Sequence, residues 1–280
     1  MKPILLLLAG LFLLGIGFGA AADVYSDINR LRSGDGRCDA VERLLPLKVE
    51  PALERVARQL SRGGKLAETM KASDYRSLRS VAFSIIGAGV GSRAAEVLSR
   101  RNQCKQLQAP GMSAVGVYVD DGQIWVVLAA PFAPTVGVSQ LAAGQTVLML
   151  VNQARAVPRA CGDKSFGAAA PVRWNDTLAN VARVHAEDMA HYNYFSHTGR
   201  DGSSPAQRVE RGGYRYRTTG ENIAAGPTMK AEDAVAGWIK SPGHCANLMN
   251  PAYTEMGLAY GVDAKSEMGI YWGQVFATPR

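Results

Sequence analysis

The sequence predicts an α+β protein in which two tandem copies of one layered fold each contain a mainly antiparallel sheet. Three observations lead to this prediction. The two halves of the 280-residue chain repeat each other, with their cysteines in step. In the second half, segments with helical periodicity come first and strand-like segments come last. The segments show no β-α-β alternation, which would be typical of a parallel sheet.

Residues 1–22 have the features of a secretory signal peptide. Lys2 precedes the apolar run ILLLLAGLFLLGIGFG, and the run is followed by Ala20, Ala21 and Ala22. A basic start, a short apolar core and a small-residue site predict cleavage before Asp23. The alternative is an uncleaved membrane anchor, for which the run is at the short limit of about 17–25 residues. We therefore expect a secreted or periplasmic protein with no transmembrane segment after cleavage.

The charge and the cysteines restrict the function classes. The net charge is +7, but acidic and basic residues are mixed and no Lys/Arg block stands out, so no nucleic-acid partner is expected. Mild basicity would suit contact with an anionic envelope component. The four cysteines form no C-x-x-C, which argues against a redox motif or a cysteine zinc site. In an exported chain they predict two disulfides, for which three pairings exist.

The internal repeat selects one of these pairings. The segment that starts at residue 25 aligns with the segment that starts at residue 148, and "LERVAR" aligns with "LANVAR". Further on, "EVLSRRNQCKQL" lies over "AGWIKSPGHCANL". The matched residues are Asn29 with Asn152, Arg32 with Arg155, Cys38 with Cys161, and Cys104 with Cys245. This alignment predicts the disulfides Cys38–Cys104 and Cys161–Cys245, one within each copy.

The repeat also sets the predicted domain boundaries. The two copies occupy residues 24–132 and 144–280, and the Ala/Pro/Gly/Val-rich segment 133–143 links them. The first copy lacks the polar region YFSHTGRDGSSPAQ and contains no histidine. In the alignment it has Phe83 at the position of Glu221 and Gln103 at that of His244. A functional site is therefore expected in the second copy only.

Periodicity and capping residues predict the elements of the second copy. The first helix covers 141–157 and ends before Pro158, and the second covers 174–192 with Asn175 or Asp176 as its N-cap. The next two helices begin at Ser204 and cover 230–241; they end at Gly212-Gly213 and at Pro242-Gly243, respectively. The apolar segments 256–262 and 269–278 are predicted to be strands.

Four motifs in this order resemble one family. "FSHTGRDGSSPAQRVERGGY", "GENIAAG", "AVAGWIKSPGHCANLMNP" and "YTEMGLAY" are similar to the bacterial branch of the CAP superfamily. These are SCP-like proteins related to cysteine-rich secretory proteins, insect venom antigen 5 and plant pathogenesis-related 1 proteins. The resemblance covers 144–280 and implies an α-β-α sandwich with an antiparallel central sheet and a cleft on one side. The first half resembles the family only through the repeat, as a degenerate copy.

The resemblance also implies a site. Eukaryotic members carry two histidines and two acidic residues in the cleft. The histidine of "FSH" is His197, the glutamate of "GEN" is Glu221, and the histidine of "PGH" is His244. The second acidic residue normally follows the tryptophan of the fourth helix by three positions, where this chain has Ser241. One carboxylate of the family pattern is therefore missing.

The chemistry of these residues leaves two interpretations open. Two imidazoles and one carboxylate, His197, His244 and Glu221, are a plausible weak site for zinc or another divalent cation. The alternative is a polar network that connects loops across the cleft. No H-E-x-x-H motif is present, because His185 and His191 lie six positions apart. His185 shares the apolar stripe of its helix and is interpreted as a hydrogen-bonded structural residue.

Serine catalysis is a further possibility. Ser196, Ser203, Ser204 and Ser241 lie close in sequence to candidate bases. No G-x-S-x-G motif is present, and no aspartate is clearly placed as a triad member. Catalytic residues therefore stay unassigned.

The sequence thus favours an exported, non-enzymatic binding module. The resemblance implies a cleft for a lipid-like small molecule or a divalent cation, and no cofactor is required. One alternative is a hydrolase that acts on peptides or cell-wall polymers through His197 and Glu221. Another is a structural adhesion or interaction protein with a vestigial site.

Overall fold

The computed structural model describes residues 16–34, 38, 44–87, 94–120 and 122–280. The chain divides into two compact units, residues 1–132 and 133–280. Most of the predicted signal peptide lies outside the described residues, and helix α1 runs across the predicted cleavage point before Asp23. Within the described ranges, none of the helices has the length and apolar character needed to cross a membrane.

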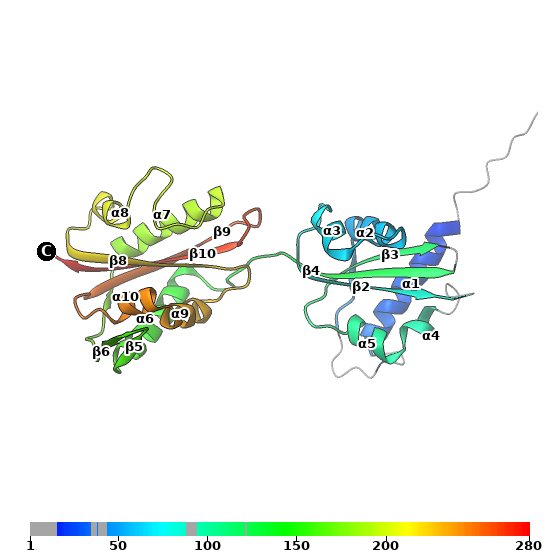
Figure 1. The fold of residues 1–280 in the computed structure, drawn as a ribbon, viewed down its shortest axis with the longest axis horizontal. Coiled ribbons are helices and arrows are strands. Elements are labelled where there is room, and N and C mark those ends of the chain that lie inside the picture. Colours follow the sequence, from blue (N-terminus) through cyan, green and yellow to red (C-terminus); the bar gives the residue numbers. More distant parts are fainter. Residues whose placement is uncertain (1–15, 35–37, 39–43, 88–93, 121) are drawn as a thin grey trace, which may run out of the picture. The chain divides into compact units, whose positions relative to one another are not determined.

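The N-terminal unit is a sheet with helices on both faces (Figure 1). Its described elements are α1 Ile16–Arg32, β1 Lys48–Val49, α2 Pro51–Ser61, α3 Leu66–Lys71, β2 Ser77–Ile86, α4 Ala94–Leu98, α5 Arg101–Leu107, β3 Ala114–Asp120 and β4 Gln123–Pro131. The strand order is β1-β3-β4-β2. Strands β1 and β3 are parallel, and the other pairs are antiparallel. One core packs between the sheet and α1, α4 and α5, and a second packs against α2.

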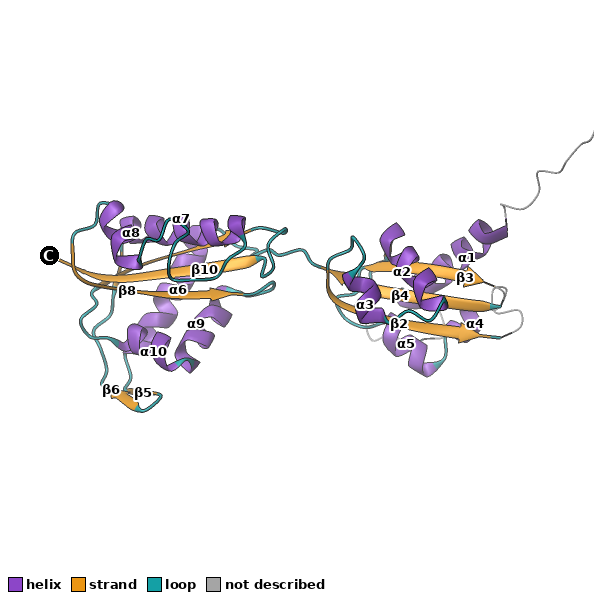
Figure 2. Cartoon of the chain, turned by 45° about the horizontal axis from the view of Figure 1, so that its top comes forward, coloured by secondary structure: helices purple, strands orange, loops and turns teal. Residues whose placement is uncertain are grey.

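The C-terminal unit is the predicted α-β-α sandwich (Figure 2). Its elements are α6 Gln140–Arg155, β5 Arg159–Cys161, β6 Lys164–Phe166, β7 Arg173–Trp174, α7 Asp176–Tyr192, α8 Pro205–Arg211, β8 Tyr216–Ala225, α9 Ala231–Lys240, α10 Pro242–Met249, β9 Glu255–Val262 and β10 Ile270–Pro279. The central sheet has the order β7-β9-β10-β8. Its two long pairs are antiparallel and β7–β9 is parallel. Helices α7 and α8 cover one face, and α6, α9 and α10 cover the other (Figure 2).

Local sequence explains where the helices around the site begin. The Asn175 side chain accepts from Leu178 N at 3.1 Å and so caps α7, as predicted. Ser204 and Gln207 form a capping box at the start of α8. This box fixes the direction of the chain directly after the polar loop.

The C-terminal unit differs from the prediction at three places. Helix α9 ends at Lys240, before Pro242, as predicted, but Pro242 begins a further helix, α10, because the first turn of a helix needs no proline N–H. Helix α6 begins at Gln140, inside the predicted linker 133–143. Strand β8 was not predicted, because its polar residues at 218–222 hide the alternation typical of a strand.

Both predicted disulfides are confirmed. Cys38 is bonded to Cys104, and Cys161 is bonded to Cys245. Each bond connects the segment after the first helix of a unit to the helix before its last two strands, and in the C-terminal unit Cys161 is the last residue of β5. The repeat alignment therefore selected the correct pairing.

The asparagines and arginines matched in the repeat have matching contacts. The Asn29 side chain accepts a hydrogen bond from the backbone N–H of Leu47, 18 residues away. The Asn152 side chain accepts one from the backbone N–H of Val172, 20 residues away. Both arginines are buried, and their guanidinium groups donate to backbone carbonyls. Arg32 donates to the carbonyls of Leu45, Leu107 and Met112, and Arg155 to those of Ala170, Leu248, Asn250 and Tyr253.

Strand pairing corrects one position of the alignment. In each sheet, a glycine that packs under a helix is paired with a residue on the adjacent strand, and that residue is paired with one on the following strand. These three residues are Gly116, Val127 and Ala82 in the first sheet, and Gly257, Val275 and Glu221 in the second. Ala82, and not Phe83, therefore takes the position of Glu221. A shift of one residue places a side chain on the opposite face, and Phe83 packs there against the core with α1.

Candidate functional site

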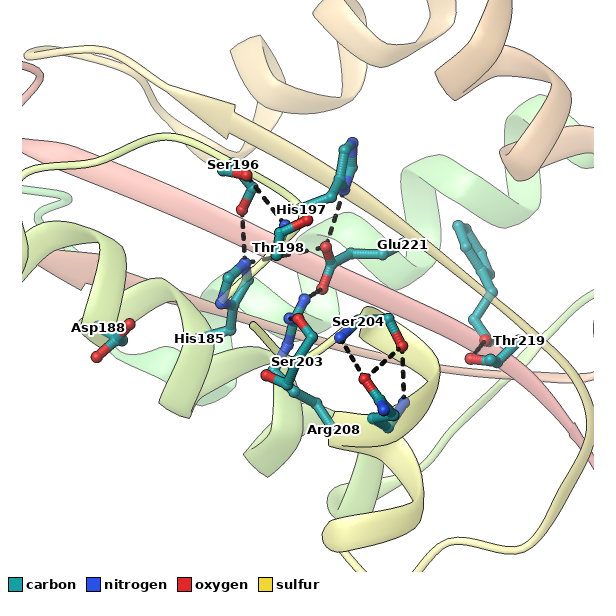
Figure 3. A network of polar contacts seen from close by, with 12 residues as sticks. His185, Asp188, Ser196, His197, Thr198, Ser203, Ser204, Arg208, Thr219 and Glu221 are labelled. Carbon is teal, nitrogen blue, oxygen red and sulfur yellow. Dashed lines mark hydrogen bonds and ion pairs between the residues drawn. The ribbon is translucent and has the colours of Figure 1, made fainter. Parts of the chain in front are cut away.

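Glu221 on β8 is the centre of a buried polar cluster (Figure 3). The residue is 6% exposed, and both of its carboxylate oxygens are engaged. His197 Nδ1 lies 2.9 Å from Oε1, a geometry in which Nδ1–H donates to the carboxylate. Arg208 Nη2 donates to Oε2 at 2.7 Å. The negative charge of Glu221 is thus balanced within the protein.

Arg208 is the residue of this cluster that the sequence analysis missed. It lies on α8, is 7% exposed, and also donates from Nη1 to Ser203 O at 2.8 Å. It therefore connects the polar loop before α8 to the strand that carries Glu221. The sequence contained one signal for it, the predicted helix start at Ser204, because the start of a helix determines the face on which Arg208 lies.

His185 on α7 has the structural role that was predicted for it. The residue is 2% exposed, and its Nε2 lies 2.9 Å from Ser196 O and 3.9 Å from Glu221 Oε1. Burial lowers the pKa of His185 below its ordinary value, and the negative charge of Glu221 opposes this effect. The ring holds the loop that leads to His197 against α7.

His244 lies in the first turn of α10, near His197. Its ring centroid lies 6.4 Å from that of His197. Burial lowers the pKa of His244, and the nearby His197 lowers it further. Asn222 Nδ2 donates to His244 O at 3.3 Å, which ties the start of α10 to β8. The structure thus brings His197 close to Glu221 and to His244.

Ser241 occupies the junction at which α9 ends and α10 begins. Its side chain makes no capping hydrogen bond to α10. No carboxylate replaces the missing acid at this position, so Glu221 is the single acidic member of the predicted set.

The predicted metal ligands fit a cation poorly. In the part of the chain that the structure describes, no three His, Cys, Asp or Glu side chains are grouped so that they could hold a metal ion. Both oxygens of Glu221 already accept hydrogen bonds, one of them from a guanidinium group. Two imidazoles remain as donors, which is fewer than the three protein ligands of a typical zinc site.

The four serines near the histidines show no catalytic arrangement. Ser196 Oγ accepts from Thr198 N at 3.0 Å, and Ser204 Oγ accepts from Gln207 N at 3.3 Å. Among the described residues, no hydrogen bond joins the hydroxyl of Ser196, Ser203, Ser204 or Ser241 to a histidine. The geometry therefore gives no nucleophile–base pair.

A cavity of about 860 Å³ lies beside the cluster, between α7, the loop 199–203 and α8. Val181, Val184 and Tyr192 give it an apolar side, and Asp188, Arg200 and Arg208 give it polar groups. His185 and Arg208 belong both to its wall and to the set of residues around Glu221. The cavity is large enough for a small molecule.

Comparison with known proteins identifies relatives of the second half. Residues 148–276 match the model of the cysteine-rich secretory protein family, CAP. The protein YkwD of Bacillus subtilis (strain 168) is 37% identical over 106 residues, which are 38% of this chain and 39% of YkwD. The membrane protein YlbC of the same organism is 41% identical over 96 residues, 34% of this chain and 27% of YlbC. The chain thus spans well under half of the length of these curated relatives.

Two solved structures are also similar. An outer surface protein from Borrelia burgdorferi has 19% identity and a TM-score of 0.41, and the match covers 51% of this chain and 97% of that one. An extracellular protein containing an SCP domain, from Bacillus anthracis, has 24% identity and a TM-score of 0.41, over 59% of this chain and 56% of that one.

Proposed function

We propose, from the premise that residues 148–276 form a CAP domain, that this protein is an exported, non-enzymatic binding module for a lipid-like small molecule. The observation that carries the proposal is the cavity of about 860 Å³ beside the Glu221 cluster. Its volume is within the range of about 300–1,000 Å³ that is typical of small-molecule sites.

The lining of the cavity supports an amphiphilic ligand. The side chains of Val184 and Tyr192 are about half exposed, at 52% and 50%, so apolar surface is available to a ligand. Arg200 lies over the Tyr192 ring at 3.5 Å and places a positive charge at this end. An acyl or ring moiety would cover the valines, and a polar head group would reach the arginine.

The charge balance at Glu221 favours a lipid-like ligand over a divalent cation. Glu221, the single carboxylate of the predicted cluster, is neutralised by Arg208 at 2.7 Å. Its affinity for a cation is therefore reduced, whereas Val184 and Tyr192 expose apolar surface in the cavity.

Ligand binding can be tested with a matched pair of variants. We expect a dansyl-labelled fatty acid to bind the wild-type chain, and Val184→Glu to weaken binding at least about tenfold, because a charge would enter the apolar wall. Val157→Glu is the control, since Val157 is also half exposed, at 50%, but does not line the cavity. The readout is the dansyl fluorescence in a titration.

Two results would contradict the proposal. One is the absence of binding to the wild-type chain together with the absence of a co-purifying lipid in native mass spectrometry. The other is equal binding by Val184→Glu and Val157→Glu, which would move the ligand away from this cavity.

Export is part of the same proposal. Its support is the basic start and the apolar run of residues 1–22. N-terminal sequencing of the protein recovered from its host checks this, with Asp23 as the expected first residue.

A hydrolase is the second candidate, and one contact favours it. The hydrogen bond from His197 Nδ1 to Glu221 leaves Nε2 as the free nitrogen of a side chain that is 49% exposed, which is how a general base is oriented. Hydrolysis of peptides or cell-wall polymers that disappears in His197→Ala would support this function. Hydrolysis that survives His197→Ala and Glu221→Ala would assign the activity elsewhere.

We also propose that the N-terminal unit is a copy of the CAP fold that has lost its site. Its support is the shared strand order and the matching contacts of Arg32 and Arg155. The region between α7 and β8, which supplies His197 and Arg208, is replaced by the short α3 and a turn. A scaffold without the site is consistent with a role in interaction.

A further inference from the structure

Strand β2 leaves one edge of the N-terminal sheet open. Gly87 N donates to Gly122 O at 3.0 Å, at the end of the β2–β4 ladder. Hydrogen-bonded and non-bonded pairs alternate in an antiparallel ladder, so odd-numbered residues of β2 bond to β4. Ser80, Ala82 and Ser84 therefore direct their backbone N–H and C=O groups outward. Within the described residues, nothing else bonds to these groups.

The corresponding edge of the C-terminal sheet is closed by side chains. Gly226 N donates to Ile270 O at 3.0 Å, which directs the carbonyls of Glu221 and Ile223 outward by the same alternation. Asn247 Nδ2 donates to Glu221 O at 3.0 Å, and Trp238 Nε1 donates to Ile223 O at 3.0 Å. Donors on α9 and α10 thus occupy this edge.

The N-terminal unit lacks these donors. Trp238 lies seven positions before Cys245, and the residue seven positions before Cys104 is Val97, which has no polar group. Gln106 follows Cys104 by two positions, as Asn247 follows Cys245, but it makes no described hydrogen bond to β2. Among the described residues, no side chain therefore closes the edge of β2 as Trp238 and Asn247 close that of β8.

The side chains of β2 make this edge prone to pairing. The strand SLRSVAFSII has ten residues, no Gly or Pro, and Arg79 as its one charge. Leu78 and Ile86 are 42% and 70% exposed. Long apolar edge strands template pairing with another strand, and proteins usually protect them by charges, proline or a cover. Here the charge of Arg79 and the bulge at Leu78 protect only the start of the strand, and residues 80–86 carry neither. An edge of this kind indicates a partner that adds a strand.

We propose that the partner is β2 of a second copy of this chain, paired antiparallel about a two-fold axis at Ala82. In this register Ile86 of the second copy lies beside Leu78, the residue at which a bulge shifts the β2–β4 register between Ser77 and Arg79. The two most exposed apolar side chains of the strand therefore lie next to each other. Val81 faces Phe83 of the second copy, and both are partly buried apolar residues.

The same register avoids a charge conflict. Arg79 lies across from Ile85 of the second copy, so the two arginines are not opposed. Arg79 also donates to Pro110 O of its own chain, which draws its charge away from the axis. A self-complementary strand of this kind forms an isologous contact, which closes at two copies. The two sheets become one continuous sheet.

The contact is small, so the dimer is expected to be weak. A strand pair with few flanking contacts buries less than the standard interface of about 1,600 Å². We therefore expect a dissociation constant of about 10 μM, to be measured by sedimentation velocity over a concentration series.

Positive charges introduced on the edge test the assignment. The double variant Leu78→Lys/Ile86→Lys is expected to weaken dimerisation at least about tenfold, because lysines would be buried opposite each other. Leu45→Lys is the matched control: Leu45 is an exposed leucine of the same unit, at 83%, outside β2. Circular dichroism of each variant confirms that the fold is retained, since these side chains are exposed.

Amide exchange locates the contact in the backbone. The N–H groups of Ala82 and Ser84 are expected to exchange quickly in dilute protein and to become protected as the dimer forms. A monomer at all concentrations overturns the proposal, as does a dimer that the double variant does not weaken. Protection of these amides in the monomer also overturns it, because the edge would then be covered by the same chain or by a bound peptide.

Discussion

At the scale of single residues, the buried charge of Glu221 explains why the surrounding residues are present. A carboxylate that is 6% exposed needs partners, and Arg208, His197 and a nearby His185 provide them. Each partner comes from a different segment, so the cluster also fixes the loop between α7 and α8. His185 and Arg208 of this cluster also line the cavity.

Protonation of His185 predicts a pH dependence of stability. Burial lowers the pKa of His185 below the ordinary 6.5, despite the opposing Glu221 and Asp188. At a pH below about 6.5 the unfolded chain therefore binds a proton that the folded chain excludes. The stabilisation by neutral His185 is complete above this pH and is lost as the pH falls, with a slope of at most about 1.4 kcal/mol per pH unit.

His185→Gln tests this dependence. When the pH is lowered from about 7.5 to about 5.5, we expect the urea midpoint of the wild-type C-terminal unit to decrease. The midpoint of the variant is expected to decrease less. The change in urea midpoint between the two pH values is compared for the two proteins, so an overall loss of stability in the variant does not affect the result. An equal fall in both proteins would assign the acid sensitivity to other groups, such as His244.

The sequence predicted part of this cluster. His197, Glu221 and His244 were predicted because their motifs resemble those of the CAP family. Arg208 was missed because an arginine on a short helix is normally solvated, and its burial depends on a carboxylate on another element. Phe83 was placed one residue out of register because a pairing shift of one is visible only from the strand hydrogen bonds.

At the scale of elements, close contact between helix and sheet determines the core. A Cβ atom on Gly257 would lie 2.0 Å from Ala179 N on α7, and one on Gly116 would lie 2.1 Å from the carbonyl carbon of Leu53 on α2. Glycine at both positions lets the helix backbone rest on the sheet. This contact holds α7, and with it His185, at a fixed distance from β8.

Gly257→Ala is therefore expected to destabilise the C-terminal unit by about 3 kcal/mol, because the clash is with backbone that cannot rotate away. Gly237→Ala on α9 is the control, since a Cβ atom there meets nothing within 4 Å. It is expected to stabilise the helix by about 1 kcal/mol. Urea unfolding measures both, and similar midpoints for the two variants would contradict the packing argument.

Elements with strong local signals were predicted, and those that depend on neighbours were not. Helix α7 has an N-cap and an apolar stripe, so its bounds follow from the sequence. Strand β8 has no such pattern, because its residues 218–222 carry the polar groups of the site. Its assignment as a strand requires β10, with which it pairs along its length.

At the scale of the whole molecule, two units repeat one arrangement of strands. Each has its own hydrophobic cores, its own buried arginine and its own disulfide. The similarity of the two halves was visible in the sequence at the paired cysteines and at the buried residues Arg32 and Arg155. The first unit forms its sheet without a segment like the polar loop 193–204.

This organisation predicts that each disulfide stabilises mainly its own unit. The cysteines of the second pair are 84 residues apart, so removing the bond frees a long loop in the unfolded chain, at a cost of about 4 kcal/mol. We expect Cys161→Ala/Cys245→Ala to lower the urea concentration at which β9 and β10 lose amide protection, and to leave β3 and β4 unchanged. Cys38→Ala/Cys104→Ala is expected to have the reverse effect. Hydrogen exchange with mass spectrometry reads both units in one sample. If either double variant opened both sheets at the same urea concentration, the two units would be a single cooperative body, and the effect of each bond would not be local.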